Sequence, residues 1–106
     1  MPFNFLYILN AAGEPVAEPD TDRWLEWKAT HGKQCIICQE HVGTDMVSTV
    51  FLAVDHGFSM KRPFLWETRV FYGPNDRRWD RCGGSREQAE AMHAKMVEAI
   101  RSKVKI

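Results

Sequence analysis

Two β-prone runs separated by a basic turn decide the fold of this chain. Residues 46–58 read Met-Val-Ser-Thr-Val-Phe-Leu-Ala-Val-Asp-His-Gly-Phe, and residues 63–73 read Pro-Phe-Leu-Trp-Glu-Thr-Arg-Val-Phe-Tyr-Gly. The part from Met46 to Val54 is almost entirely apolar on both faces, which is typical of a central strand. In the second run, Trp66, Val70 and Tyr72 alternate with Glu67 and Arg69, so one face is expected to be buried and the other to meet solvent.

Shorter elements are expected on both sides of this pair. Three further segments are β-prone: 3–9, 34–42 and 77–82, of which the last is expected to be a short edge strand. A helix is predicted to begin at Asp20 or Thr21, because either residue can cap its free N–H groups. Gly32 should end this helix shortly after Thr30.

The C-terminal segment carries the clearest helical pattern. Ser85 and Gln88 have the spacing of a capping box, in which each side chain bonds the backbone N–H of the other residue. An apolar stripe follows at helical spacing: Ala89, Met92, Met96, Ile100 and Val104. The order of strand, helix, several strands and helix predicts a single α+β domain over residues 1–106. We expect an antiparallel sheet of about four strands with two helices packed on one face.

Composition restricts the class of protein. The 106 residues include 14 basic and 14 acidic side chains, so the formal net charge is zero. This balance argues against a general nucleic-acid binder. No apolar run reaches ~18 residues, so no membrane association is expected. The beginning of the chain lacks the pattern of a signal peptide, and its three cysteines are an odd number. These features predict reduced thiols in a bacterial host cytoplasm.

Several segments resemble a small family that is common in tailed phages and prophages. The resemblance lies in the run Val47–His56, the run Glu67–Phe71, the helical segment Glu87–His93 and the early pair Leu6–Leu9 and Gly13–Val16. It covers most of the chain and weakens between Trp27 and Asp45. Family members usually have Gly-Leu where this chain has Ala53-Val54, and Met where it has Arg69. The resemblance implies a phage accessory protein and no particular chemistry.

Four potential zinc ligands lie close together in the sequence: His31, Cys35, Cys38 and His41. Zinc prefers such thiolate and imidazole ligands. However, the two isoleucines between the cysteines favour an extended chain, in which residues three apart point to opposite faces. A reactive thiol pair is disfavoured for the same reason, since it normally requires a helix N-terminus. We therefore expect no stoichiometric zinc, no cofactor and no redox cysteine pair, with zinc as the open alternative.

A second candidate site involves Asp55, His56 and His93. Asp55 and His56 end the central run, where strands open onto loops. His93 lies inside the apolar stripe of the last helix, so a buried imidazole with a hydrogen-bonding partner such as Asp55 or Glu67 is the simpler interpretation. The alternative is a small hydrolase in which a carboxylate orients His93 as a general base. No nucleophile-elbow motif supports that alternative.

A third candidate site is the basic and aromatic segment with Arg77, Arg78, Trp79 and Arg81. In a strand, Arg77, Trp79 and Arg81 would share one face, suited to a phosphate, a nucleobase or a carboxylate. The simpler interpretation is a solvated edge strand whose charges prevent edge-to-edge pairing. If these residues are on the surface, changing Arg77 and Arg81 to alanine should barely move the melting temperature.

The sequence as a whole predicts a non-enzymatic phage accessory protein that acts by contact with a host or defence protein. The residues expected to bind are Arg77, Arg78, Trp79, Arg81, Asp55 and His56. Two alternatives stay open: a small hydrolase using Asp55, His56 and His93, and a nucleic-acid or nucleotide binder using Arg77, Trp79 and Arg81.

Overall fold

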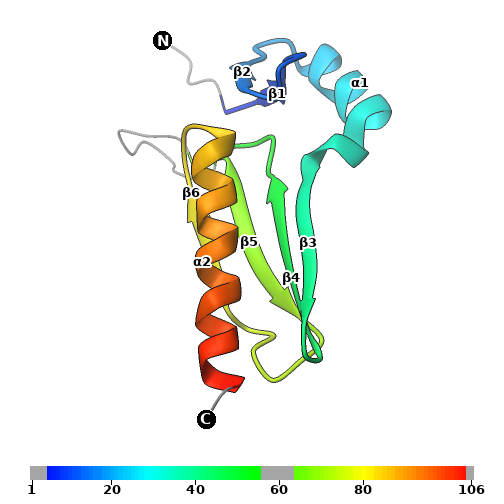
Figure 1. The fold of residues 1–106 in the computed structure, drawn as a ribbon. Coiled ribbons are helices and arrows are strands. Elements are labelled where there is room, and N and C mark those ends of the chain that lie inside the picture. Colours follow the sequence, from blue (N-terminus) through cyan, green and yellow to red (C-terminus); the bar gives the residue numbers. More distant parts are fainter. Residues whose placement is uncertain (1–4, 56–63, 105–106) are drawn as a thin grey trace.

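The protein has an α+β fold, as predicted, in a computed structural model that describes residues 5–55 and 64–104. Its elements in chain order are β1 (Tyr7–Leu9), β2 (Pro15–Ala17), α1 (Thr21–His31), the 3-10 turn η1 (Gly32–Cys35), β3 (Ile36–Val42), β4 (Asp45–Phe51), β5 (Trp66–Phe71), β6 (Trp79–Cys82) and α2 (Arg86–Val104). Strands β3 to β6 form an antiparallel sheet in sequence order, and β1 pairs with β2 in a separate two-stranded sheet. Helix α2 lies along one face of the larger sheet and contacts all four of its strands (Figure 1).

The register of the sheet sorts its side chains onto two faces. The inner face, which meets α2, is made by Cys38, Glu40, Val42, Val47, Thr49, Phe51, Trp66, Thr68, Val70, Asp80 and Cys82. The outer face, which is turned away from α2, is made by Ile36, Gln39, His41, Met46, Ser48, Val50, Glu67, Arg69, Phe71, Trp79 and Arg81. A bulge between Ile36 and Cys38 shifts the register of β3. Ile36 and Cys38 therefore lie on opposite faces, although residues two apart in a regular strand share a face.

Strand β4 is the interior strand that its apolar sequence predicted. It pairs with β3 on one side and β5 on the other, and Val47, Thr49 and Phe51 are buried beneath α2. The strand ends at Phe51, earlier than predicted, because the backbone at Ala53 turns into the left-handed region with φ of 62°. Glycine adopts this conformation without strain, whereas alanine adopts it at a cost.

The N-terminal elements gather at one end of the larger sheet (Figure 1). Trp24 of α1 donates its indole N–H to the carbonyl oxygens of Ala53, at 3.0 Å, and Tyr7, at 3.2 Å. Trp27 contacts the edge of Phe51 with ring centroids 6.2 Å apart. Asp20 caps α1 by accepting from the N–H groups of Asp22 and Arg23, as predicted. Helix α1 is therefore attached to the end of the sheet by its two tryptophans.

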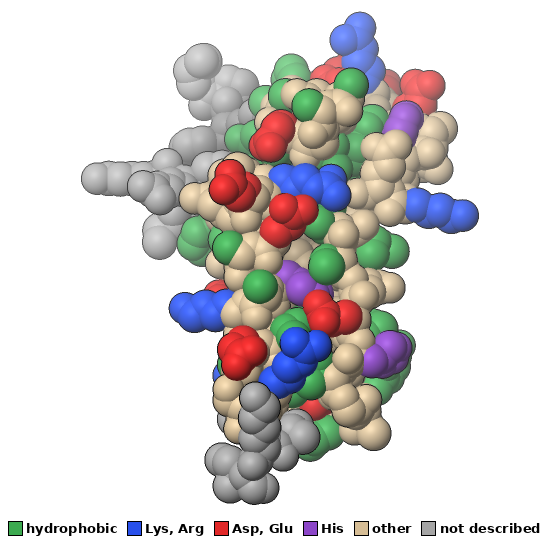
Figure 2. Space-filling view, viewed as in Figure 1, with side chains coloured by type: hydrophobic (Ala, Val, Ile, Leu, Met, Phe, Trp, Pro, Cys, Tyr) green, Lys and Arg blue, Asp and Glu red, His purple; other side chains and the backbone are tan. Residues whose placement is uncertain are grey.

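Helix α2 begins with the predicted capping box. Ser85 Oγ accepts from the Gln88 N–H at 3.2 Å, and Gln88 Oε1 accepts from the Ser85 N–H at 3.1 Å. The apolar stripe packs on the inner face, where Ala89, Met92, Met96, Val97 and Ile100 are all buried. The opposite side of α2 carries a mixture of acidic and basic side chains without a large apolar patch (Figure 2). Neither described helix has the length and apolar character that crossing a bilayer requires.

Candidate functional site

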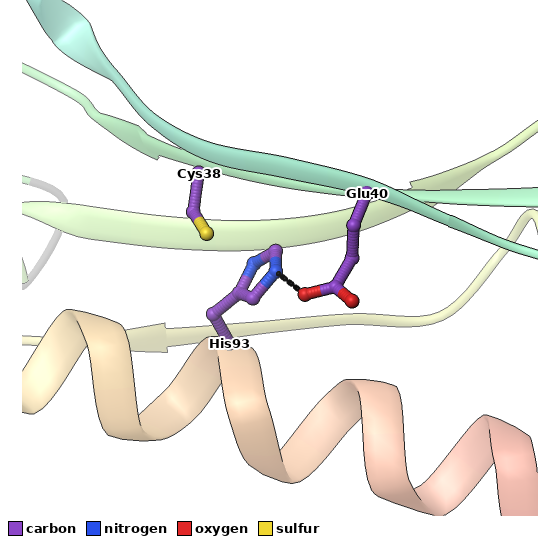
Figure 3. A group of neighbouring side chains, drawn as sticks. All are labelled: Cys38, Glu40 and His93. Carbon is purple, nitrogen blue, oxygen red and sulfur yellow. Dashed lines mark hydrogen bonds and ion pairs between the residues drawn. The ribbon is translucent and has the colours of Figure 1, made fainter.

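A line of polar side chains crosses the otherwise apolar contact between α2 and the sheet. His93 is 3% exposed and points from α2 onto the inner face. Its Nδ1 lies 2.7 Å from Thr49 Oγ1, and its Nε2 lies 3.0 Å from a carboxylate oxygen of Glu40. Cys38 and Glu40 both extend from β3 toward this imidazole (Figure 3). The prediction of a buried His93 is confirmed, but Asp55 and Glu67 were the wrong partners.

This line holds a hydroxyl, an imidazole and a carboxylate, the three groups that a hydrolase combines. Thr49 is completely buried at the centre of the sheet and is also hydrogen-bonded to Thr68. A substrate carbonyl cannot approach a hydroxyl in that position. Two cavities among the described residues, of about 420 and 120 Å³, have other linings and do not include His93. The geometry therefore supports a structural hydrogen-bond chain better than it supports a hydrolytic site.

The thiol of Cys38 is not activated as a nucleophile. Burial raises the pKa of Cys38, and the nearby carboxylates of Glu40 and Glu90 raise it further, while Arg86 opposes them. The pKa values of Cys35 and Cys82 are also raised, in both cases mainly by burial. Because a thiolate is the reactive form of cysteine, none of these thiols has the environment of a redox or catalytic cysteine.

The four potential zinc ligands that are neighbours in the sequence do not gather in the structure. His31 stacks on Trp27 in α1, Cys35 is buried at the end of η1, and His41 is exposed on the outer face. Cys38 lies on the inner face of the sheet, opposite Thr49. Within residues 5–55 and 64–104, the side chains close enough to hold a metal ion together are a different group: Cys38, Glu40 and His93, each with a potential ligand atom within 4.8 Å of the others.

The candidate pair at the end of the central run is only partly described. One carboxylate oxygen of Asp55 accepts from the backbone N–H of Phe64 at 3.0 Å, which ties together the two sides of the connection between β4 and β5. His56 lies outside the described residues, so its predicted role stays a prediction.

The basic and aromatic segment is divided among three environments. Strand β6 begins only at Trp79, so Arg77 lies in the preceding turn and is exposed. Trp79 and Arg81 share the outer face, as alternation predicted. Arg78 is on the other side, where it lines the 120 Å³ cavity beside Met92 and Met96 of α2. Its backbone carbonyl accepts from the N–H of Val70. Arg78 therefore does not contribute to the surface that carries Trp79.

Glu67 organises the outer face, a role that the sequence did not reveal. Its carboxylate accepts from Arg81 Nε at 2.8 Å and pairs with Arg69 Nε at 3.3 Å. The guanidinium of Arg81 lies 4.8 Å from the ring centroid of Trp79, which is 54% exposed. The register places Glu67 opposite Arg81, and only this pairing brings the carboxylate and both cations together. The ring of Trp79 is therefore stabilised by a cation–π contact with Arg81, whose position is fixed by Glu67.

Arg77→Ala and Arg81→Ala should differ in stability, although the sequence suggested that neither would matter. Arg81→Ala removes the nearest cation from Glu67, whose side chain is 11% exposed, so we expect a loss of about 1–2 kcal/mol. Arg77→Ala removes an exposed side chain and should stay within ~0.5 kcal/mol of the parent. Urea unfolding of both variants measures the difference. Equal stability of the two variants would show that Arg69 alone compensates Glu67.

Comparison of the chain with protein-family models, with curated proteins and with solved structures finds no match. A function is therefore inferred from the fold and from the arrangement of side chains.

Glu40 and Thr49 were not predicted as partners of His93, because these contacts depend on the strand register. The sequence does contain a signal for Glu40, since Cys38, Glu40 and Val42 alternate in a strand and must share a face.

Proposed function

We propose that this protein is a non-enzymatic binding protein that contacts a protein partner through the outer face of its sheet. The observation that carries the proposal is the side chain of Trp79, which is more than half exposed on a sheet face that no described helix covers. Arg81 lies against its ring and is in turn held by Glu67. Tryptophan and arginine are the residue types most enriched among those that dominate binding energy.

The charges of the outer face favour a protein over a nucleic acid. Arg69 and Arg81 share the single carboxylate of Glu67, so Arg81, one of the cations expected to meet phosphate, is already paired. The whole chain has no net positive charge. Nucleic-acid binding depends on unpaired cations whose contacts with phosphate weaken as salt rises. Nucleotide and nucleic-acid binding thus has less support than protein binding.

The partner class follows from the resemblance to phage accessory proteins. A protein of that origin meets host proteins and host defence proteins in the infected cell, and a host or defence factor is accordingly the proposed partner. The left-handed backbone at Ala53, where the resembling family has glycine, is compatible with a shared local conformation. The proposed function is recognition of a host or defence protein through Trp79, Arg81 and the surrounding outer face.

Site-specific photocrosslinking tests this proposal. A photoreactive phenylalanine analogue replaces Trp79 in one variant and the exposed Glu98 of α2 in a control variant, and both are irradiated in bacterial lysate. We expect the variant at position 79 to form a discrete adduct that mass spectrometry identifies as a bacterial protein. The identified protein is then purified, and its binding to the parent chain and to Trp79→Ala is measured.

Binding to the parent that Trp79→Ala weakens by about 2 kcal/mol or more would support the proposal. Binding through the charged side of α2, shown by an adduct at position 98 and by full affinity of Trp79→Ala, would contradict it. Salt-sensitive retention of the parent on single- or double-stranded DNA, lost in Arg77→Ala, would favour the nucleic-acid alternative instead.

A further inference from the structure

We propose that Cys38, Glu40 and His93 form a binding site for a single zinc ion between β3 and α2. These three residues supply sulfur, oxygen and nitrogen, the donor set that proteins use for zinc. They come from two elements, and the register of β3 puts Cys38 and Glu40 on the same face toward His93 (Figure 3). The site lies on the inner side of the sheet and is independent of the function proposed for the outer face.

The distances fit a metal with a small adjustment. Two ligand atoms that bind one tetrahedral zinc at about 2.0–2.1 Å lie about 3.3 Å apart. His93 Nε2 and the Glu40 oxygen are 3.0 Å apart, which is close to that separation. One ligand atom from each of Cys38, Glu40 and His93 lies within 4.8 Å of the other two, so the thiol needs to approach by about 1.3 Å at most. Cys38 lies on an edge strand beside a bulge, where such a movement is tolerated.

The surroundings of His93 prepare its Nε2 to bind a metal. Metal-binding histidines usually donate their other ring N–H to a neighbouring acceptor, which selects the tautomer and orients the ring. Thr49 Oγ1 lies 2.7 Å from Nδ1, so it can accept this proton while its own hydroxyl donates onward to Thr68. The lone pair of Nε2 then points toward Glu40, and Cys38 lies on the other side of the ring (Figure 3). The hydroxyl groups of Thr49 and Thr68 would therefore orient the metal-binding histidine, in addition to packing in the core.

The second carboxylate oxygen of Glu40 is also held in place. Arg101, two turns after His93 on α2, approaches it at 3.5 Å. The first oxygen is thus directed at the imidazole. Glu40 is 39% exposed, whereas His93 is almost completely buried, so the ion would sit where the contact between β3 and α2 meets solvent. Three protein ligands leave a fourth position for water in a tetrahedral site.

The charges of the ligands suit a divalent first-row ion. A thiolate and a carboxylate together neutralise the two positive charges of zinc, and the neutral imidazole completes the set. The thiolate and imidazole select zinc over calcium or magnesium, which prefer oxygen ligands alone. The sequence predicted no stoichiometric zinc, on the argument that Cys35 and Cys38 cannot reach one ion, and the present proposal departs from that prediction. The proposed site uses only one of those cysteines and draws its other ligands from distant positions.

Cobalt(II) is the probe for the test, because it occupies zinc sites and gives visible absorption bands that report thiolate ligation. The full-length protein is purified with chelator, kept reduced with a phosphine, dialysed and titrated with cobalt and then zinc. Parallel titrations use Cys38→Ser, Glu40→Gln and the matched control Cys82→Ser, whose thiol is half-buried but lies outside the cluster. Far-ultraviolet circular dichroism verifies that each variant is folded.

We expect the parent and Cys82→Ser to bind a single cobalt ion per chain with a thiolate-to-metal absorption band, and zinc to displace it. Cys38→Ser should lose the band, and its affinity for cobalt should fall by more than about 100-fold. Removal of a residue that only supports a metal ligand typically costs about 10- to 100-fold, and loss of a ligand should cost more. Glu40→Gln should keep the band with weakened affinity. Zinc should raise the melting temperature of the parent and leave that of Cys38→Ser unchanged.

Absence of cobalt uptake by the parent would overturn the proposal, and so would a thiolate band that persists in Cys38→Ser. Loss of the band in Cys82→Ser with retention in Cys38→Ser would assign the metal to another place and likewise overturn it. Thr49→Val supplies a separate check on the supporting hydroxyl. This change preserves shape, and it should weaken cobalt binding about 10- to 100-fold without removing the band. Unchanged affinity in Thr49→Val would contradict the role assigned to that hydroxyl.

Discussion

Trp66→Ala should reduce the free energy of unfolding by about 4 kcal/mol, the largest effect expected of any single change described for this chain. Trp66 is completely buried on the inner face, with its ring centroid 5.0 Å from that of Phe51. Its indole N–H donates to the carbonyl of Gly84 at 3.0 Å. Alanine would leave a large cavity and remove the donor. Domains of this size are stable by roughly 5–15 kcal/mol, so such a loss would bring the variant close to unfolding.

Trp66→Phe and Trp79→Ala provide the matched comparisons. Phenylalanine keeps most of the buried ring and loses the hydrogen bond to Gly84, so about 1–2 kcal/mol should be lost. Trp79→Ala removes a tryptophan that is 54% exposed and should cost about 1 kcal/mol at most, mainly the contact with Arg81. Urea unfolding followed by circular dichroism gives all three values. Similar losses for Trp66→Ala and Trp79→Ala would contradict the assignment of one tryptophan to the core and the other to a binding surface.

His93→Ala should lower the free energy of unfolding by about 3 kcal/mol, measured in the presence of chelator so that no metal contributes. The change removes a buried side chain and leaves the hydroxyl of Thr49 without its partner at Nδ1. The melting temperature should fall by more than about 10 °C. His93→Gln keeps polarity and part of the volume, so it should lose less.

His41→Ala is the control for His93→Ala, since His41 is exposed on the outer face and its removal should stay within ~0.5 kcal/mol. A stability of His93→Ala equal to that of His41→Ala would refute the structural role of the buried chain. The same pair of variants separates stability from metal binding, because His93→Ala should lose zinc binding and His41→Ala should retain it.

The two proposals concern opposite faces of the same sheet. Trp79, Arg81 and Glu67 lie on the outer face, whereas Cys38, Glu40 and His93 lie between the sheet and α2. A variant of one face should therefore leave the other property intact. Trp79→Ala should bind cobalt with unchanged affinity, and Cys38→Ser without added metal should retain any affinity for a partner that depends on Trp79.

Local patterns were sufficient for the elements whose signals lie within a few residues. Ser85 and Gln88 predicted the start of α2, and the apolar stripe that follows predicted which side of the helix packs on the sheet. The apolar run after Met46 predicted an interior strand, because burial on both faces removes the need for alternation. The extent of that strand was overestimated, since nothing in the composition near Ala53 indicated a left-handed backbone turn.

The candidate sites were less predictable, because each depends on strand register. Four residues of the basic and aromatic segment lie within five positions of one another, yet the start of β6 at Trp79 places only Trp79 and Arg81 on the outer face. Likewise, the spacing of Cys35 and Cys38 left two interpretations in the sequence: a zinc site that uses both thiols, or no metal site. The bulge in β3 then directed Cys38 toward a helix that begins 48 residues later.

The sequence by itself determined the α+β class, the start of α2, the interior position of β4 and the burial of His93. Each follows from periodicity or capping, which act between residues a few positions apart. Only the tertiary structure decided that His93 meets Glu40 and Thr49, 53 and 44 positions away, and that Glu67 meets Arg81. Those contacts arise where strands pair in a particular register, and a shift of one residue would exchange the two faces of the sheet.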